Sequence, residues 1–570
     1  MKVLKPIMYT AVAGMLLAGC KSSINTIPVP NGADTVINIP AKKGKLSEIE
    51  VQTWSHMDLE TDSIPGMSIA KAYQFLEGKK GVSIIVGIAD SGVDVEHEDL
   101  KNVVWINPKE VAGNNKDDDR NGYTDDVHGW NFLGNKDGKI VNADQLEITR
   151  IVKNGMDKFG DKNASEIADA DKDEFQQYLK LKEVFEAREA EKKTEIENLK
   201  STTERIRQIE NNFKDVKELA GTENLTVAIV KSLKATDDKM AAKIADISGM
   251  LQRGMTEQGL QDYKKQLSNY LKSQEKGKSY DLDFDARQTL GDNLYDITDK
   301  YYGNNNVIGS KDLESHGTHV AGIVAASRNN DKGVNGVANN VKIMAVRVVP
   351  DGDEHDKDVA LGIRYAVDNG AKIINTSFGK AYSPNKQWVY DAIRYAAKKD
   401  VLIVNAAGND GKNIDIVKTF PNDSEDLANE ISDNVLTIGA MSLHYDEKLP
   451  AGFSNYGKMN VDVFAPGVDI YATMPKDEYA PNSGTSMAAP SAAGVAALVR
   501  SYYPKLSASQ VKHILMNSGT KINFEVIKPG SQSRENPDGE KVPFSDLSVS
   551  GRVVNAYNAL KMADRIVNGK

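Results

Sequence analysis

The chain of 570 residues predicts an α/β fold, in which helices flank a parallel sheet and a long helical insertion interrupts the domain. Two observations lead to this prediction. Short apolar runs of strand length alternate with segments of helical periodicity, a pattern that is typical of parallel sheets. Residues 133–304 depart from this pattern, because they are rich in Lys, Glu, Asp and Gln. We therefore predict one domain in two parts, residues 54–132 and 305–570, with a charged helical insertion between them.

The beginning of the chain has the features of an export signal. Lys2 and Lys5 precede a mostly apolar stretch, residues 7–17, that is too short for an ordinary membrane-spanning helix. Leu-Ala-Gly then precedes Cys20, the only cysteine, and this sequence resembles a bacterial lipobox. We predict a signal peptide over residues 1–19 and acylation of Cys20, since two or more acyl chains anchor a protein stably. An ordinary signal peptide followed by a coincidental cysteine is the alternative.

A protein processed in this way is exported and anchored by lipid to a bacterial membrane. We expect the outer membrane, on a face that the sequence does not specify. Residues 20–53 contain several prolines and little periodicity, so we predict a tether between the anchor and the globular domain. A short helix is expected over residues 70–75.

The strands of the sheet are predicted from apolar runs. Residues 82–89 form such a run and lead directly into Asp90-Ser91-Gly92, as expected for a buried parallel strand followed by a turn. Further runs and the helical patterns between them cover residues 341–349, 358–368, 372–374, 388–399, 401–404 and 435–438. Residues 523–550 indicate an extended excursion, and residues 551–567 a closing helix.

The insertion carries a short coiled-coil-like seam. Its apolar positions are spaced alternately by three and four residues, at Leu199, Thr202, Ile206, Ile209, Phe213 and Val216. We expect one helix over residues 174–219 and two more within residues 229–270. A bundle that packs on itself is the simpler interpretation. An arm that binds a partner or restricts access to substrate is the alternative.

The composition argues against some classes of function. Hydrophobic residues make up 40% of the chain and charged residues 27%, an ordinary balance for a globular protein. The net charge of −10 disfavours a nucleic-acid partner, which would require a basic face. We also expect no organic cofactor.

Two candidate catalytic residues lie at the ends of predicted elements. Asp90 ends the first strand, where α/β folds place functional side chains, although a simple turn-forming aspartate is the alternative. His316 precedes a run of small and apolar residues that predicts a buried helix. His319 is interpreted as a packed core residue, since a metal site with His316 would lack a third ligand nearby.

Two further candidates suit the stabilisation of negative charge. Ser486 begins a predicted helix that continues through residue 498, so free backbone N–H groups lie near its hydroxyl. A plain N-cap serine is the alternative. Asn409 follows the strand of residues 401–404, from which its amide could donate to an oxyanion.

Together these residues resemble the subtilisin-like (S8) serine peptidases. The motifs Asp-Ser-Gly, His-Gly-Thr-His, Ala-Ala-Gly-Asn and Gly-Thr-Ser-Met-Ala-Ala-Pro are all present, and Asp, His and Ser occur in the order of that family. The resemblance covers residues 80–132 and 305–520. It implies the subtilisin fold and an endopeptidase that acts on peptides or proteins through an acyl-enzyme.

The resemblance also implies the role of each residue. Ser486 would attack the scissile carbonyl, His316 would act as general base and then acid, and Asp90 would orient the imidazole. Asn409 and the Ser486 N–H would form the oxyanion hole. Four residues would bind substrate. Ser377 and Gly379 belong to residues 375–379, the edge segment that pairs with the substrate backbone. Ala407 and Gly408 line the pocket for the side chain before the cleaved bond.

Two alternative functions and two departures from the family accompany this resemblance. A catalytically silent surface protein that uses the fold as a binding scaffold is the alternative function. An α/β-hydrolase esterase is disfavoured, because no Gly-x-Ser-x-Gly motif surrounds Ser486. The insertion separates the Asp and His motifs more widely than in most family members, and residues 54–81 are too short for a large folding propeptide.

An acidic turn near residue 120 is a candidate calcium site. Three residues have the 1, 3, 5 spacing of a calcium loop, with Gly122 at the sharp turn and two more aspartates available to close the shell: Asp117, Asp119, Asn121, Asp125 and Asp126. His128 stands where an EF-hand has its bidentate Glu, so the loop is not a complete EF-hand. Relatives of the subtilisin type often hold structural calcium. A solvated acidic turn is the alternative.

Overall fold

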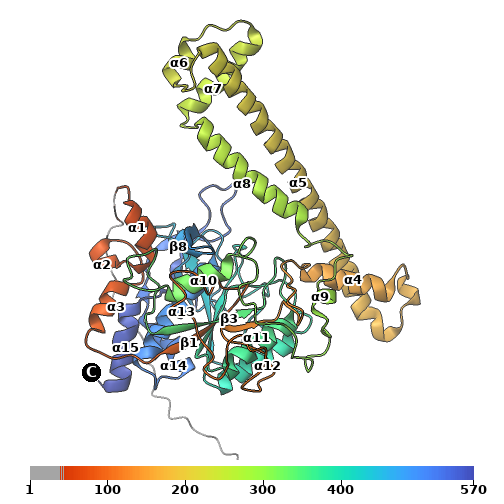
Figure 1. The fold of residues 1–570 in the computed structure, drawn as a ribbon, viewed down its shortest axis with the longest axis vertical. Coiled ribbons are helices and arrows are strands. Elements are labelled where there is room, and N and C mark those ends of the chain that lie inside the picture. Colours follow the sequence, from red (N-terminus) through yellow and green to blue (C-terminus); the bar gives the residue numbers. More distant parts are fainter. Residues whose placement is uncertain (1–38, 40–41, 43, 570) are drawn as a thin grey trace, which may run out of the picture.

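The computed structural model describes residues 39, 42 and 44–569 (Figure 1). The predicted signal peptide of residues 1–19, Cys20 and most of the predicted tether therefore lie outside the described residues. Among the helices that are described, none combines the length and the apolar character needed to cross a bilayer.

A nine-stranded sheet forms the centre of the molecule, and its strands follow the order β10-β13-β7-β6-β5-β4-β1-β3-β2. All neighbouring pairs are parallel except β10 with β13. The prediction of a parallel sheet is thus confirmed. The strands are β1 Ile84–Asp90, β2 Gly129–Asn131, β3 Val341–Arg347, β4 Ile373–Thr376, β5 Leu402–Ala406, β6 Val435–Met441, β7 Val463–Pro466, β10 Thr520–Lys521 and β13 Arg552–Val553. Two short hairpins lie outside this sheet and consist of β8 Ile470–Met474 with β9 Glu478–Asn482, and β11 Glu525–Ile527 with β12 Lys541–Pro543.

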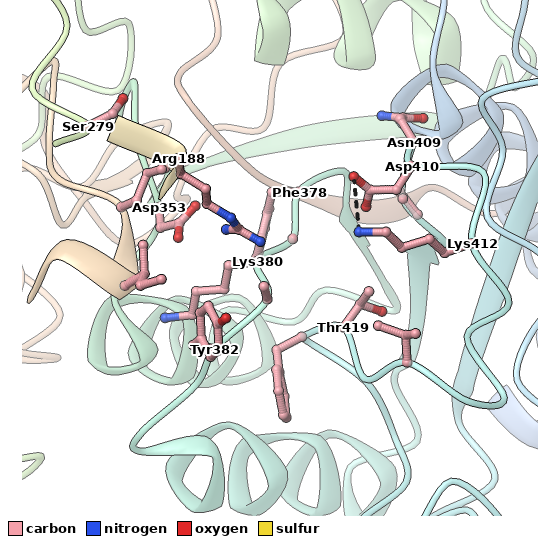
Figure 2. Close-up of a pocket in the computed structure, with 18 of the residues that line it drawn as sticks. Arg188, Ser279, Asp353, Phe378, Lys380, Tyr382, Asn409, Asp410, Lys412 and Thr419 are labelled. Carbon is pink, nitrogen blue, oxygen red and sulfur yellow. Dashed lines mark ion pairs between the residues drawn. The ribbon is translucent and has the colours of Figure 1, made fainter. Parts of the chain in front are cut away.

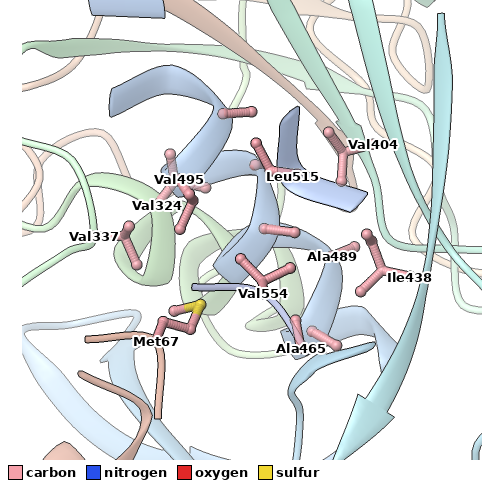
Figure 3. Packing of buried hydrophobic residues seen from close by; sticks show 14 of the residues in the cluster. Met67, Val324, Val337, Val404, Ile438, Ala465, Ala489, Val495, Leu515 and Val554 are labelled. Atoms are coloured by element: carbon pink, nitrogen blue, oxygen red, sulfur yellow. The ribbon is translucent and has the colours of Figure 1, made fainter. Parts of the chain in front are cut away.

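Helices cover both faces of the sheet, which explains why its strands are apolar at most positions. Within β3, Ile343 and Ala345 belong to the core on one face, whereas Met344 and Val346 belong to the core on the other. One face carries α3 Ile69–Phe75, α10 His316–Ala325, α13 Thr485–Tyr502, α14 Ala508–Ser518 and α15 Ala556–Asn568, and the other carries α11 Asp356–Asp368 and α12 Lys386–Lys398. Figure 3 shows small side chains of α13, such as Ala489, packed among Val404, Ile438 and Leu515.

Residues 54–76 belong to the main core of the domain. Trp54 and Met67 are fully buried in the same cluster as α13 and α15. The backbone N–H of Ala556 donates to the carbonyl of Met67, and Asn555 donates to the Ser68 hydroxyl. Two short helices precede α3: α1 Glu48–Thr53, which ends just before this segment, and α2 Leu59–Asp62 within it.

The insertion is helical, as predicted, and projects from the domain of the nine-stranded sheet as a long hairpin (Figure 1). Its helices are α4 Glu147–Phe159, α5 Lys172–Ala220, α6 Val227–Ser232, α7 Asp238–Gln252, α8 Glu257–Lys276 and α9 Arg287–Leu290. The predicted seam is buried at Ile206, Phe213 and Val216, where α5 packs against α6, α7 and α8. The helix α4 was not predicted, although its buried residues Ile148, Val152 and Phe159 follow a helical spacing.

Candidate active site

Asp90 and His316 meet where the strand β1 ends and the helix α10 begins. His316 Nδ1 lies 2.7 Å from Asp90 Oδ1, and the same oxygen accepts the backbone N–H of Ser91 at 2.8 Å. This close approach requires glycine at residue 317, since a Cβ there would lie 2.3 Å from the Gly92 carbonyl oxygen. The carboxylate is buried, whereas the imidazole is partly exposed. A proton on Nδ1 is therefore held by Asp90, which leaves Nε2 to accept another proton.

Ser486 is the second residue of α13, and a proline determines how its backbone is bound. In an α-helix the N–H of residue 490 would bond to the carbonyl of residue 486, but Pro490 has no N–H. The Ser377 hydroxyl donates to this carbonyl instead, at 2.9 Å. In return, Ser486 Oγ donates to the Ser377 carbonyl at 3.1 Å. The hydroxyl thus points to the edge segment, and rotation about the Cα–Cβ bond would be needed to turn it toward His316.

Two N–H donors converge beside Ser486. The side-chain oxygen of Asn409 accepts the backbone N–H of Thr485 at 2.8 Å and its hydroxyl at 3.0 Å, so Nδ2 points away from Thr485. A Cβ placed on Gly484 would lie 3.6 Å from both Asn409 Nδ2 and the backbone N of Ser486. Two donors aimed at the same region can stabilise a negatively charged oxygen there.

A cavity of about 680 Å³ opens next to Ser486. Gly379, Ala407 and Gly408 line it, as the sequence predicts for substrate-binding residues, and so does Asn409. Ser377 is buried and uses its hydroxyl to hold Ser486, so its contribution to the edge segment is a backbone one. Figure 2 shows Phe378 and Lys380 on one side of this cavity and Asn409 on the other.

The insertion supplies part of the cavity wall. The helix α5 contributes Arg188, Glu191, Lys192 and Glu195, and the segment after α8 contributes Ser279 and Tyr280. Figure 2 shows Arg188 and Ser279 on the same side as Asp353 and Phe378. Sequence reasoning did not find these residues, because nothing in the local pattern of α5 relates it to a segment near residue 379.

A buried ion pair joins the insertion to the edge segment. Lys380 directly follows Gly379, and its Nζ lies 2.6 Å from Glu147 Oε2 in α4 and 2.9 Å from Asp356 Oδ1 in α11. It also donates to the Glu354 carbonyl at 2.7 Å. Burial lowers the pKa of Lys380, but Glu147 and Asp356 raise it by more, so the ammonium remains charged.

The acidic turn brings three carboxylates together. Oxygens of Glu110, Asp119 and Asp126 lie within 4.8 Å of one another. Burial raises the pKa of Asp126 to about 6, although hydrogen bonds from Tyr365, Asn121 and Asn107 oppose this rise. Glu110 was not predicted, because it lies outside the spacing of the motif. Its Oε2 is buried and has no hydrogen-bond partner among the described residues.

The other predicted ligands face the loop backbone. Asp117 accepts the backbone N–H groups of Asn121 and Gly122 at 3.1 and 2.8 Å, which shapes the turn. Asp125 accepts from the backbone of Gly113 and Asn115, so the structure places both of its oxygens away from the carboxylate cluster.

Comparisons with known proteins agree on one family. The model of the Subtilase family matches residues 81–539. Thermitase from Thermoactinomyces vulgaris is 41% identical over 209 residues, which cover 36% of this chain and 68% of thermitase. Subtilisin DY from Bacillus licheniformis is 38% identical over 217 residues, which cover 37% of this chain and 72% of that protein.

Some relatives are considerably longer than the region they share with this chain. A thermophilic serine proteinase from Bacillus sp. (strain AK1) is 42% identical over 279 residues, which cover 49% of this chain and 58% of that protein. The cell wall-associated protease of Bacillus subtilis (strain 168) is 36% identical over 275 residues, and these cover 47% of this chain but 28% of that protein.

Proposed function

The chain belongs to the subtilase family, and we propose on this basis that it is a serine endopeptidase that cleaves peptide bonds through an acyl-enzyme. The observation that carries the proposal is the bond between Asp90 and His316 at the end of a parallel strand, together with the packing of α10, which begins at His316, against α13, whose second residue is Ser486. A fluorophosphonate probe tests it, because such probes react with a hydroxyl that a neighbouring base activates. A folded protein that takes up no probe would favour a binding role instead.

In the proposed reaction, each step uses an atom whose surroundings suit it. Ser486 Oγ turns from the Ser377 carbonyl, gives its proton to His316 Nε2 and attacks the scissile carbonyl. Asp90 holds the imidazole through Nδ1 and stabilises its charged form. The Asn409 amide and the Ser486 N–H bind the oxyanion of the tetrahedral intermediate. His316 then gives its proton to the leaving amine, and water hydrolyses the acyl-enzyme by the same steps.

The peptidase activity is expected to depend on the protonation of His316. A general base must be neutral in the free enzyme, so kcat/KM should rise with pH through the pKa of His316. Burial lowers this pKa, but the charge and hydrogen bond of Asp90 raise it by more, so that it lies above its ordinary value of 6.5. Asp90→Asn should therefore shift the midpoint of this rise to lower pH and also lower the plateau.

Initial rates on a peptide substrate across a pH series measure this midpoint. His513→Gln is a matched control, since Asp433 also raises the pKa of that histidine, but on a helix outside the cavity wall. The control should leave the midpoint unchanged. A wild-type midpoint below 6.5, or an unchanged midpoint in Asp90→Asn, would contradict the proposed role of His316.

We further propose that the acidic turn binds a structural Ca²⁺. The convergence of Glu110, Asp119 and Asp126 supports this, as does the buried Glu110 oxygen that has no hydrogen-bond partner in the described part of the chain. Carboxylate oxygens are the ligands that Ca²⁺ prefers, and backbone carbonyls or water would complete its shell. The ion would neutralise repulsion among the three carboxylates and would hold the loop, without taking part in the chemistry.

Removal of calcium is expected to lower the melting temperature. A ligand present at 100 times its Kd stabilises a fold by about 2.7 kcal/mol, which for a chain of this length corresponds to a fall of about 2 °C on chelation. Differential scanning calorimetry with and without chelator measures the difference. Asp119→Asn should abolish most of it, whereas Asp137→Asn, in an exposed turn elsewhere, should retain it. An equal response in Asp119→Asn would mean that any bound calcium lies elsewhere.

We also propose that residues 1–19 are removed and that acylated Cys20 anchors the protein to a bacterial membrane. The basic start, the apolar stretch and the lipobox-like residues support this. The full-length chain should incorporate a tagged palmitate in bacterial cells and should sediment with the membrane fraction, and Cys20→Ser should lose both properties. Adding Ser23→Cys to that variant is a matched control that should not restore the label. A labelled Cys20→Ser protein would overturn the proposal.

A further inference from the structure

Arg188 brings a positive charge from the insertion to the substrate cavity. It lies on α5, is half-buried and lines the same cavity as Gly379, Ala407 and Ser486. Figure 2 shows its guanidinium reaching from the helix toward Phe378 of the edge segment. A substrate side chain bound in this cavity would therefore lie close to an arginine, on the side of the cavity opposite Asn409.

The guanidinium forms no ion pair and no hydrogen bond among the described residues, whereas several other charges around the cavity have partners. Lys380 is bound by Glu147 and Asp356, and Lys412 lies 3.8 Å from Asp410. Glu195, on the same wall, accepts the Tyr270 hydroxyl at 2.9 Å. Lys192 lies over the Tyr280 ring. Arg188 therefore has N–H donors available for a ligand, as does Lys192, while Glu191 on the same wall is a carboxylate with no ion pair among the described residues.

One carboxylate lies near Arg188 without neutralising it. Figure 2 shows Asp353 on the same side of the cavity as the guanidinium, and the two form no ion pair among the described residues. Asp353 instead accepts the backbone N–H of Glu147 at 2.8 Å. Burial raises the pKa of Asp353. A carboxylate carried by a ligand would therefore find the guanidinium free to form a bidentate pair.

The position of Arg188 is also well determined. Phe185, one turn before it, is buried with Phe175, Tyr178 and Leu181 against α4. The helix α4 is in turn joined to the edge segment by the pair between Glu147 and Lys380. The backbone of Arg188 is therefore held in a fixed position relative to the cavity, although a ligand would still have to order the rotamers of the side chain.

We propose that Arg188 is a specificity-determining residue that selects substrates with an acidic side chain on the N-terminal side of the scissile bond. The inference rests on the proposed peptidase function, because the cavity shared with Ala407 and Gly408 is the one assigned to residues before the cut. The insertion is then a part of the substrate-binding site. An exposed charge pair would contribute little free energy to substrate binding. The half-buried position of Arg188 and the paired N–H donors of its guanidinium favour a measurable preference for an acidic side chain.

We test the proposal with pairs of fluorogenic peptide amides. The two peptides of a pair differ only at one position before the cleaved bond, where one has Glu and the other has Gln. The wild type should prefer Glu at one of these positions by roughly tenfold in kcat/KM. Arg188→Gln should reduce this ratio to near one, and Arg188→Glu should reverse it. Arg205→Gln, an exposed arginine further along α5, is the matched control and should keep the wild-type ratio.

Fluorophosphonate labelling of each variant separates two kinds of failure. Labelling that is normal in every variant, together with a Glu to Gln ratio near one in the wild type, would overturn the role of Arg188 alone. A wild-type preference for Glu that Arg188→Gln retains would overturn it as well. Absence of labelling in the folded wild type would overturn both the peptidase function and the specificity that rests on it.

Discussion

Replacing Ser486 with alanine is expected to lower kcat/KM for peptide hydrolysis by roughly 10⁴-fold or more and to abolish labelling by a fluorophosphonate. The substitution removes the proposed nucleophile but keeps the backbone N–H that faces the oxyanion. Alanine also suits the start of α13, so the fold should persist. The lost hydrogen bond to the Ser377 carbonyl should cost only about 1 kcal/mol of stability. The variant should therefore melt near the wild-type temperature while losing its activity.

Two comparisons make this result specific. Ser483→Ala changes an exposed serine that lies three residues earlier and bonds to Asp469, and it should keep full labelling and activity. Mass spectrometry of the labelled wild type should place the probe on the peptide that contains Ser486. Labelling that persists in Ser486→Ala, or that maps to another serine, would refute the proposed nucleophile even if the protein proved to be a hydrolase.

Replacing Lys380 with methionine is expected to destabilise the protein by about 3–5 kcal/mol, because it leaves buried carboxylates without their counter-ion. The Lys380 side chain is only 2% exposed and lies between Glu147 and Asp356. The loss should also reduce kcat/KM, since Lys380 is adjacent to Gly379 and joins the edge segment to the insertion. Urea-induced unfolding at neutral pH measures the change in the free energy of unfolding.

The pH dependence of this effect follows from Glu147. Burial raises the pKa of Glu147, but Lys380 and Arg150 lower it by more, to about 2 from an ordinary value of 4.5. A lowered pKa contributes stability that is present above pH 4.5 and is lost as the pH falls toward 2. The wild type should therefore lose more stability on acidification than Lys380→Met, and the two should converge at low pH.

An exposed lysine provides the control for the Lys380 experiment. Lys398→Met, in the last turn of α12, should change the free energy of unfolding by less than about 0.5 kcal/mol. If Lys380→Met unfolds at the same urea concentration as the wild type, the buried pairs would not stabilise the junction between the insertion and the catalytic domain.

The sequence alone predicted the parts of the fold that depend on local pattern. The apolar runs leading to β1, β3, β4, β5 and β6 were correct, because strands buried on both faces need apolar residues at each position. The long helix α5 and its seam were also correct, since helical periodicity extends along the whole segment. The short strands β2, β10 and β13 were not predicted, because two or three residues carry no period.

Some residues of the candidate site could likewise be identified from local sequence pattern, and others could not. Asp90, His316, Asn409 and Ser486 were identified in the sequence because each lies in a short motif whose neighbours are small enough for close approach. Glu110 and Arg188 were not identified, since no motif contains them. The placement of Asp125 also depended on the path of a distant part of its loop, where it binds the backbone of Gly113 and Asn115.

By itself, then, the sequence determined the family resemblance, the central strands, the long helix and the residues of the proposed triad. Only the tertiary structure decided that the insertion forms a wall of the substrate cavity and that Lys380 is bound to Glu147. The physical reason is the separation of these residues along the chain. Contacts within a motif follow from periodicity and steric size, whereas a contact between α5 and the edge segment requires the whole insertion to leave the domain, fold and return.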